Sequence, residues 1–183
     1  MNYLDRRRGA RGMRAAPSAT DAQFALDRFG RLAILSAAEH DEATMCRLIE
    51  SSLVELCGAR VLVILRWGAT PDTFEHVRST HPAIHPSGEF PGAPDDLFLQ
   101  RILRATEAEH WPDARAAGSA FLACEQLMAQ GCESALSVPI RFGGRTLGAI
   151  VLMHKAHWYQ PGHIVLCQPF AAMLAADWAA SRH

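Results

Sequence analysis

The sequence predicts a mixed domain of the α/β class (α+β), in which paired strands and long helices share one core. Two apolar segments meet at Gly143-Gly144, which is a strong hairpin signal because both central residues of such a turn need positive φ. The segment 59–67 is rich in β-branched residues and apolar on both faces, as a buried central strand requires. An amphipathic helix over 161–180 directly follows the hairpin.

Cap residues, turn residues and helical periodicity divide the rest of the chain into further elements. The segment 80–94 contains four prolines and two glycines, so we expect a long loop there rather than a helix or an interior strand. The other predicted elements, in chain order, are a helix from an N-cap at Thr20 or Asp21 to about residue 38, a helix over 42–56 ended by Gly58, an edge or second strand over 73–79, a helix from Asp95 to about Thr106, a short strand over 109–111 and a helix over 120–130 ended by Gly131.

Pairing across the hairpin predicts two faces of the sheet. If Phe142 opposes Arg145, an uninterrupted register places Ser137 opposite Ile150. We expect Ser137 and Ile150 on a smaller, partly polar face that meets the middle helices and leaves room for a ligand. The other face would pack on the terminal helices, and it would carry Leu136, Val138, Ile140, Leu147, Ala149 and Val151.

The last predicted helix has two different sides. One side is bulky and apolar, while the other is nearly all alanine. Small residues permit close approach of helices, so we expect a partner helix on that side. This partner is either the first helix or a copy in a second subunit, which predicts a homodimer formed through the first and last helices.

The composition limits the classes of partner. With 183 residues the chain fits one domain, and its net charge of -1 argues against nucleic acid or anionic membrane as the main partner. No apolar run approaches the roughly 18 residues of a membrane helix. Five cysteines and no secretory segment favour a reducing cytoplasm without a disulfide framework. Abundant alanine and a single lysine among the basic residues suggest a GC-rich bacterial genome.

The N-terminal segment 1–19 is rich in arginine and has no apolar core, so we expect a disordered basic tail rather than a secretory signal. Met13 is an alternative start to Met1. The segment 20–40 then forms the N-terminal dimerisation helix, and 41–183 forms the folded domain.

A resemblance to a known family is carried by residues in and after the hairpin. They are Gly131, Ser134, Val138-Pro139-Ile140, Gly144, Leu147-Gly148 and Trp158-Tyr159. Together they resemble the closing half of a GAF domain, the small-ligand sensory module of signalling proteins. The resemblance implies a GAF/PAS-like central antiparallel sheet of five to six strands. It also implies N- and C-terminal helices on one face of the sheet and middle helices and loops on the other.

The resemblance implies a stand-alone domain that binds a small, aromatic or apolar molecule and acts in trans on a signalling or transcription partner. Ser137 and Ile150 would form the floor of the pocket, and His85 would lie in a lid formed by the loop 81–85. The aromatic and apolar residues that could form its walls, or could instead be plain core, are Phe98, Trp111, Phe121 and Leu122. The sequence identifies no cofactor.

Two other chemistries remain open. Cys132 and Cys124 are candidates for thiol redox chemistry, because some GAF proteins, the free methionine-R-sulfoxide reductases, react through pocket cysteines; Cys132 follows a helix-ending glycine and should be partly exposed. The histidines that could ligate a metal, or could instead be solvated loop residues, are His81, His85, His154 and His157. No acidic residue or Cys-x-x-Cys motif accompanies any histidine pair.

Overall fold

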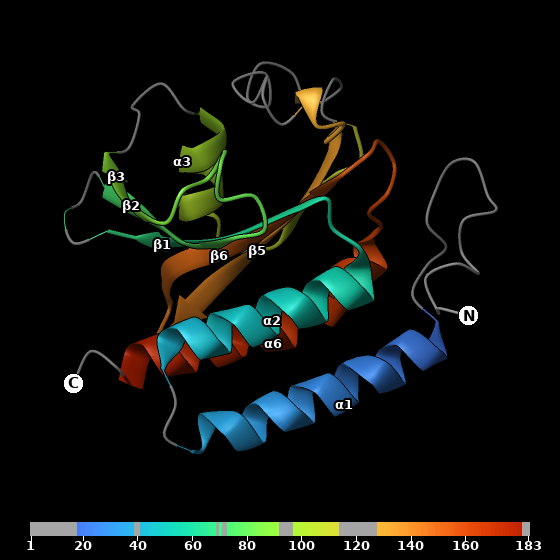
Figure 1. Ribbon diagram of the computed structural model, residues 1–183, viewed down its shortest axis with the longest axis vertical. Coiled ribbons are helices and arrows are strands. Elements are labelled where there is room, and N and C mark those ends of the chain that lie inside the picture. The colour runs from blue at the N-terminus through green and yellow to red at the C-terminus, as the bar shows by residue number, and fades with distance from the viewer. Residues whose placement is uncertain are drawn as a thin grey trace.

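A computed structural model describes residues 18–38, 41–68, 70, 73–91, 97–113 and 128–180. Its centre is a six-stranded antiparallel sheet with the strand order β3-β2-β1-β6-β5-β4 (Figure 1). This confirms the predicted antiparallel sheet between two helical layers. The strands are β1 (Val61–Trp67), β2 (Thr73–Ser79), β3 (Gly88–Pro91), β4 (Glu109–Trp111), β5 (Ser134–Phe142) and β6 (Arg145–His154).

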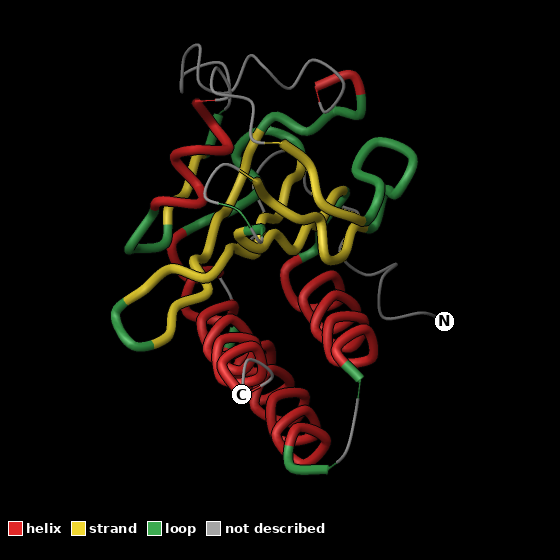
Figure 2. The backbone as a smooth tube through the Cα atoms, turned by 90° about the vertical axis from the view of Figure 1, so that its left-hand side faces the viewer, coloured by secondary structure: helices red, strands yellow, loops and turns green. Residues whose placement is uncertain are grey.

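On one side of the sheet α2 (Glu42–Cys57) and α6 (Pro161–Ala180) lie next to the strands and α1 (Ala19–Ser36) packs on these two helices, while a short helix lies on the other side. Figures 1 and 2 show the three long helices on the first side. The helix α3 (Leu97–Arg104) lies on the opposite face. The helix predicted over 120–130 lies largely outside the described residues, as does the tail 1–17.

The helix caps follow local chemistry. Asp41 accepts from the Thr44 N–H and caps α2, and Gly58 ends this helix with φ of 67°, as predicted. The N-cap predicted at Thr20 or Asp21 was wrong. Ser18 caps α1 instead, and Asp21 completes a reciprocal capping box with it, because a carboxylate at the third helical position can bond back to the cap backbone.

The prediction of a loop over 80–94 is wrong for residues 88–91, which form β3 and pair with β2 at the edge of the sheet. Phe90 opposes Phe74, and Pro91 ends the strand opposite Thr73. An edge strand tolerates proline, since its outer side needs no N–H donor. The turn residues therefore excluded an interior strand but not an edge strand.

The core on the long-helix side is formed by alternate residues of the central strands. Fully buried side chains of β1, β5 and β6 pack there against α2 and α6. The first helix joins this layer through an edge-to-face contact of Phe29 with Phe170, whose ring centroids are 6.3 Å apart. The buried side of α6 includes Leu166, Phe170, Met173, Leu174 and Trp178, as predicted, and also His163, Cys167, Ala171 and Ala175.

Of the helices in the described ranges, α6 alone is long and apolar enough to cross a membrane by length and composition. Half of its most apolar window is buried inside the domain, against the sheet and the neighbouring helices. This burial is typical of a core helix.

An arginine in β1 ties the sheet to two helices. Arg66 pairs with Glu42 of α2 and Glu75 of β2, each at 2.7 Å, and its guanidinium lies 5.1 Å from the ring centre of Trp178 in α6. Burial disfavours its charge, but hydrogen bonds and charge attraction to the two carboxylates outweigh this and raise the pKa of Arg66. Arg66 thus joins β1, β2, α2 and α6.

The predicted hairpin register is interrupted by one extra residue. Gly143 and Gly144 have φ of 55° and 79°, as the predicted turn requires, and Phe142 opposes Arg145. Arg141 then opposes Thr146 but Ile140 opposes Gly148, so Leu147 is a bulge in β6.

The bulge moves Ile150 away from the position expected for it. Ser137 now opposes Val151, and Val138 opposes Ile150. Because a shift of one residue exchanges the two faces of a strand, the prediction that Ser137 and Ile150 share a face was wrong. Ile150 and Leu152 lie in the core under the long helices, whereas Ala149 and Val151 lie on the α3 side.

Two glycines make a matched test of packing. A Cβ at Gly148 would overlap the Leu65 carbonyl oxygen of the neighbouring strand, whereas a Cβ at Gly30 in α1 would meet open space. We expect Gly148→Ala to lower the free energy of unfolding by about 2–3 kcal/mol, because backbone atoms must move. Gly30→Ala should raise it by up to about 1 kcal/mol through helix propensity. Urea unfolding followed by circular dichroism measures both, and an unaffected Gly148→Ala variant would contradict the close strand packing.

Candidate functional site

The α3 side of the sheet has a second core in which several side chains are small. Ala135 and Ala149 are fully buried on this side. Ile102 and Leu103, on the inner side of α3, belong to the same core. Small side chains on β5 and β6 make this face less bulky than the face under the long helices.

Ser137 lies on this face in β5, the strand next to the edge strand β4. It is opposite Glu109 of β4 on one side and Val151 of β6 on the other. Its side chain is fully buried, and its Oγ has no hydrogen-bond partner among the described residues. An unpaired buried hydroxyl costs about 1–3 kcal/mol, so this group is a candidate to bind a polar atom of a ligand.

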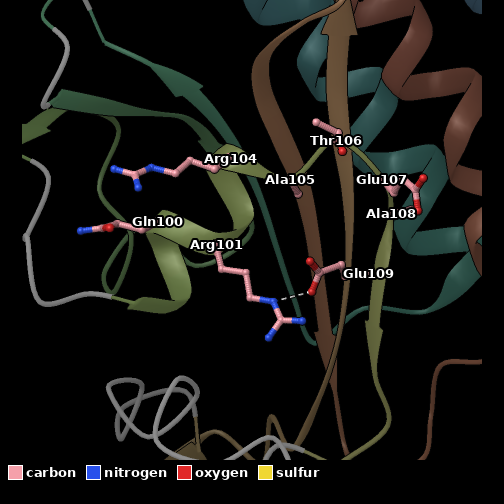
Figure 3. A pocket seen from close by; sticks show the side chains of 8 residues that line it. All are labelled: Gln100, Arg101, Arg104, Ala105, Thr106, Glu107, Ala108 and Glu109. Atoms are coloured by element: carbon pink, nitrogen blue, oxygen red, sulfur yellow. Dashed lines mark hydrogen bonds and ion pairs between the residues drawn. The ribbon is translucent and has the colours of Figure 1, made fainter.

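An open hollow lies between α3 and β4 on the same side of the molecule. Its volume is about 550 Å³, and Figure 3 shows the side chains around it. Arg101 forms an ion pair with Glu109 at 2.7 Å, and its guanidinium lies 5.6 Å from the ring centre of Trp111. The lining residues are Gln100, Arg101, Arg104, Ala105, Thr106, Glu107, Ala108 and Glu109.

Arg104 is the lining cation that remains available to a ligand. Its side chain is exposed and points away from the Arg101–Glu109 pair in Figure 3, beside that of Gln100. Among the residues that the structure describes, it has no ion-pair partner. Gln100 and Arg104 are one helical turn apart on α3, and Figure 3 shows both side chains extending from the helix to the side away from β4.

A second hollow of about 450 Å³ lies on the other side of the segment 105–108. It is formed between this segment, β5 and α6, and its lining includes Val138, Pro139, Ile164, Gln168, Ala171 and Ala172. Residues 106–108 line both hollows. Arg141 donates to the Thr106 carbonyl at 3.1 Å, and Thr146 donates to the Ala105 carbonyl at 2.9 Å. The hairpin therefore holds this segment in place between the two hollows.

The structure brings together only part of the predicted site. Ser137 and Trp111 lie on the α3 side, and Trp111 is largely buried beneath Arg101, while Ile150 faces the long helices. Phe121, Leu122 and the side chain of Phe98 lie outside the described residues. Arg101, Arg104 and Glu109 were missed, although the polar stripe of Gln100, Arg101 and Arg104 opposite Ile102 and Leu103 was a readable signal.

Comparison with known proteins agrees with this architecture. The family description of GAF domains matches residues 41–177. The chain belongs to the GAF domain family. No match to a curated protein was found.

Solved structures similar to this GAF domain share its fold at low sequence identity. The GAF domain of a phosphoenolpyruvate-protein phosphotransferase from Coxiella burnetii has a TM-score of 0.73 and 18% identity, covering 88% of this chain and 96% of that one. The nlh2 GAF domain of A. aeolicus in an inactive state has a TM-score of 0.69 and 10% identity, covering 88% and 99%. A free methionine-R-sulfoxide reductase from Neisseria meningitidis, in complex with its substrate, has a TM-score of 0.69 and 15% identity, covering 94% and 98%.

The position of Cys132 in the structure does not favour the thiol chemistry expected for it. The prediction of partial exposure was wrong, because Cys132 is fully buried in the core on the α3 side. Burial raises the pKa of its thiol to about 11, although the nearby Arg60 acts in the opposite direction. The reactive thiolate is therefore disfavoured at this position. Cys124 lies outside the described residues.

The candidate metal ligands lie in two separate places. His81 and His85 are in the turn between β2 and β3, while His154 stacks on Trp158 with ring centroids 3.8 Å apart and His157 is exposed. Within the described ranges, no group of three or more histidine, cysteine or acidic side chains is arranged to hold a metal ion.

His85 belongs to a cluster of rings at the β2–β3 edge that the sequence did not reveal. Its ring is edge-on to His76 at 5.2 Å, and His76 lies 5.1 Å from Phe90. Nδ1 of His76 is 3.2 Å from the Pro86 carbonyl oxygen, and Nε2 of His85 is buried without a partner among the described residues. Burial, and then the charges of His76 and His81, lower the pKa of His85 to about 4; burial also lowers the pKa of His76.

These lowered pKa values predict that the domain becomes less stable in acid. The ordinary histidine pKa is 6.5, so between about pH 6.5 and pH 4 the unfolded chain binds protons that His85 in the folded domain does not. The free energy of unfolding should therefore be greatest above about pH 6.5 and fall as the pH is lowered to about 4. His85→Phe should reduce this fall, whereas the exposed control His157→Asn should not. Urea midpoints measured across this pH range test it, and equal pH slopes for wild type and His85→Phe would contradict it.

Proposed function

We propose that this GAF domain is a small-molecule-binding sensory domain of the bacterial cytoplasm, acting in trans on a signalling or transcription partner. The observation that supports this most is the hollow between α3 and β4. Its lining includes an uncommitted cation, Arg104, and also Glu109, which pairs in the sheet with Ser137, whose buried hydroxyl has no partner among the described residues. Such a combination of volume and a few directed polar groups is typical of small-ligand sites.

The polar lining favours a ligand with an acidic group over the purely aromatic or apolar ligand expected from the sequence. Arg101 is engaged by Glu109, so an incoming anion would pair with Arg104. The buried Ser137 hydroxyl would meet a second polar atom of the ligand.

The segment 105–108 offers a mechanical route from the hollow to the helical layer. It forms a wall of the proposed ligand site and also a wall of the second hollow, whose far side is α6. A ligand that displaces this segment would change the packing beside Gln168, Ala171 and Ala172. We propose that α6 and α1 carry this change to a second subunit and to the protein partner. Large apolar side chains exposed on these helices, as a homodimer interface would use, are Leu26, Ile34 and Val165.

The alternative of a thiol-dependent redox enzyme or sensor similar to free methionine-R-sulfoxide reductase has less support. The similarity to that enzyme is one of fold, and Cys132 is buried with a raised pKa. A ligand sensor should keep its binding after Cys132→Ser, whereas a thiol enzyme should lose turnover of free methionine sulfoxide.

Arg104 provides the first test of the ligand site. Native mass spectrometry of the freshly purified full chain would identify a retained molecule, and thermal shifts with small carboxylic acids and phosphate monoesters would rank ligand classes. We expect Arg104→Ala to weaken the Kd of the best binder at least about tenfold, since a charge-assisted hydrogen bond contributes about 1.5–3 kcal/mol. Arg47→Ala, an exposed arginine on α2, is the control and should leave the Kd unchanged. Equal Kd values for both variants would rule out the proposed role of Arg104.

Ser137 provides the second test, because stability and binding should change in opposite directions. Without ligand, Ser137→Ala should raise the free energy of unfolding by about 1 kcal/mol, since it removes an unpaired buried hydroxyl. The same variant should weaken binding of the ligand identified in the first test. Urea unfolding and isothermal titration calorimetry measure the two effects, and a destabilised ligand-free variant would show that the hydroxyl is already satisfied.

A further inference from the structure

Two cysteines far apart in the sequence meet where α2 ends against α6. Sγ of Cys57 and Sγ of Cys167 are 3.6 Å apart, and both side chains are fully buried in the core under the long helices. Within the described part of the chain, theirs is the one recorded contact between two thiols. A disulfide bond is about 2.05 Å long, so the sulfurs need to approach by only about 1.5 Å from their separation of 3.6 Å.

The backbone around Cys57 is held by side chains that follow the hairpin. Trp158 donates its indole N–H to the carbonyls of Cys57 and Gly58, both at 3.0 Å, and Tyr159 donates its hydroxyl to Gly58 at 3.1 Å. These bonds satisfy carbonyls at the end of α2 and fix the position of Cys57 relative to α6. The two thiols are therefore held in contact by the fold.

The two sulfurs are not equivalent. The hydrogen bond with Cys57 and then burial raise the pKa of Cys167 well above its usual range, so the Cys167 thiol stays protonated. Cys57 is the last residue of α2, whereas Cys167 lies inside α6, so we assign the first reaction with an oxidant to Cys57. Cys46 has no thiol in contact among the described residues, and burial raises its pKa to about 12.

We propose that Cys57 and Cys167 form an oxidisable dithiol site, which small hydroperoxides convert into a disulfide joining α2 to α6. The hydroperoxide transfers one oxygen atom to Sγ of Cys57, giving a sulfenic acid and releasing an alcohol, or water from hydrogen peroxide. Sγ of Cys167 then attacks the sulfenic sulfur, the S–S bond forms, and the hydroxyl leaves as water with the Cys167 proton. Two thiols are oxidised and one peroxide is reduced.

Such a bond would constrain the helical layer. It would link positions separated by 110 residues and would tie the end of α2 to the helix that also lines the second hollow. Cross-links that close long loops stabilise the folded state by constraining the unfolded chain, and the Tm should rise on the order of 5 °C. The site is independent of the proposed ligand hollow, which lies on the opposite face of the sheet.

Mild oxidation of the full chain tests the site. After treatment with hydrogen peroxide and alkylation of the remaining thiols under denaturing conditions, we expect two of the five thiols to be protected. Peptide mapping without reductant should find the peptides containing Cys57 and Cys167 joined, and dithiothreitol should reverse both the cross-link and the rise in Tm.

Four variants separate this site from general thiol oxidation. Cys57→Ser and Cys167→Ser should each abolish the cross-link and the rise in Tm, while Cys46→Ser and Cys132→Ser should keep both. Circular dichroism checks that each variant is folded. If Cys57→Ser or Cys167→Ser does not fold, the peptide map of the oxidised wild type tests the cross-link. Five alkylatable thiols after oxidation, or a cross-link between other cysteines, would overturn the proposal.

Discussion

The pairing of β5 with β6 is the constraint on which the rest of the structure depends. These two strands lie inside the sheet, and away from the turn their side chains are buried on the long-helix side or on the α3 side. The bulge at Leu147 sets the register, and the register decides which residues each layer meets. Bulky residues such as Ile150 then fill the core under the helices, and the smaller residues Ala135, Ser137 and Ala149 are left for the α3 side.

The two faces of the sheet therefore differ in their side chains. The long-helix face is closed by apolar packing and by Arg66, which joins β1, β2, α2 and α6. The α3 face combines small side chains with a polar rim. The segment 105–108 lies at the open edge of β5 and borders a hollow on each side, so it links the face proposed for ligand binding with the helices proposed for output.

Burial accounts for most of the side chains whose pKa is shifted. Burial disfavours a charge, so buried histidines titrate lower and buried cysteines titrate higher than exposed ones. His85 follows this rule at the β2–β3 edge, and Cys46 and Cys132 follow it in the core. Cys57 and Cys167 are distinguished from these residues by their contact, with the two sulfurs 3.6 Å apart.

The sequence by itself determined the features that depend on neighbouring residues. Local φ preferences and periodicity account for the glycine conformations at Gly143-Gly144, the cap at Gly58 and the apolar side of 161–180. The family resemblance follows from residues in the hairpin and in the segments next to it. Only the tertiary structure decided the bulge at Leu147, the edge strand 88–91, the Arg101–Glu109 pair and the contact of Cys57 with Cys167. One added residue in a strand exchanges the two faces of the strand, but it does not change the hydrophobic pattern of the sequence. Contacts between residues far apart in the chain produce no periodicity in the sequence from which they could be predicted.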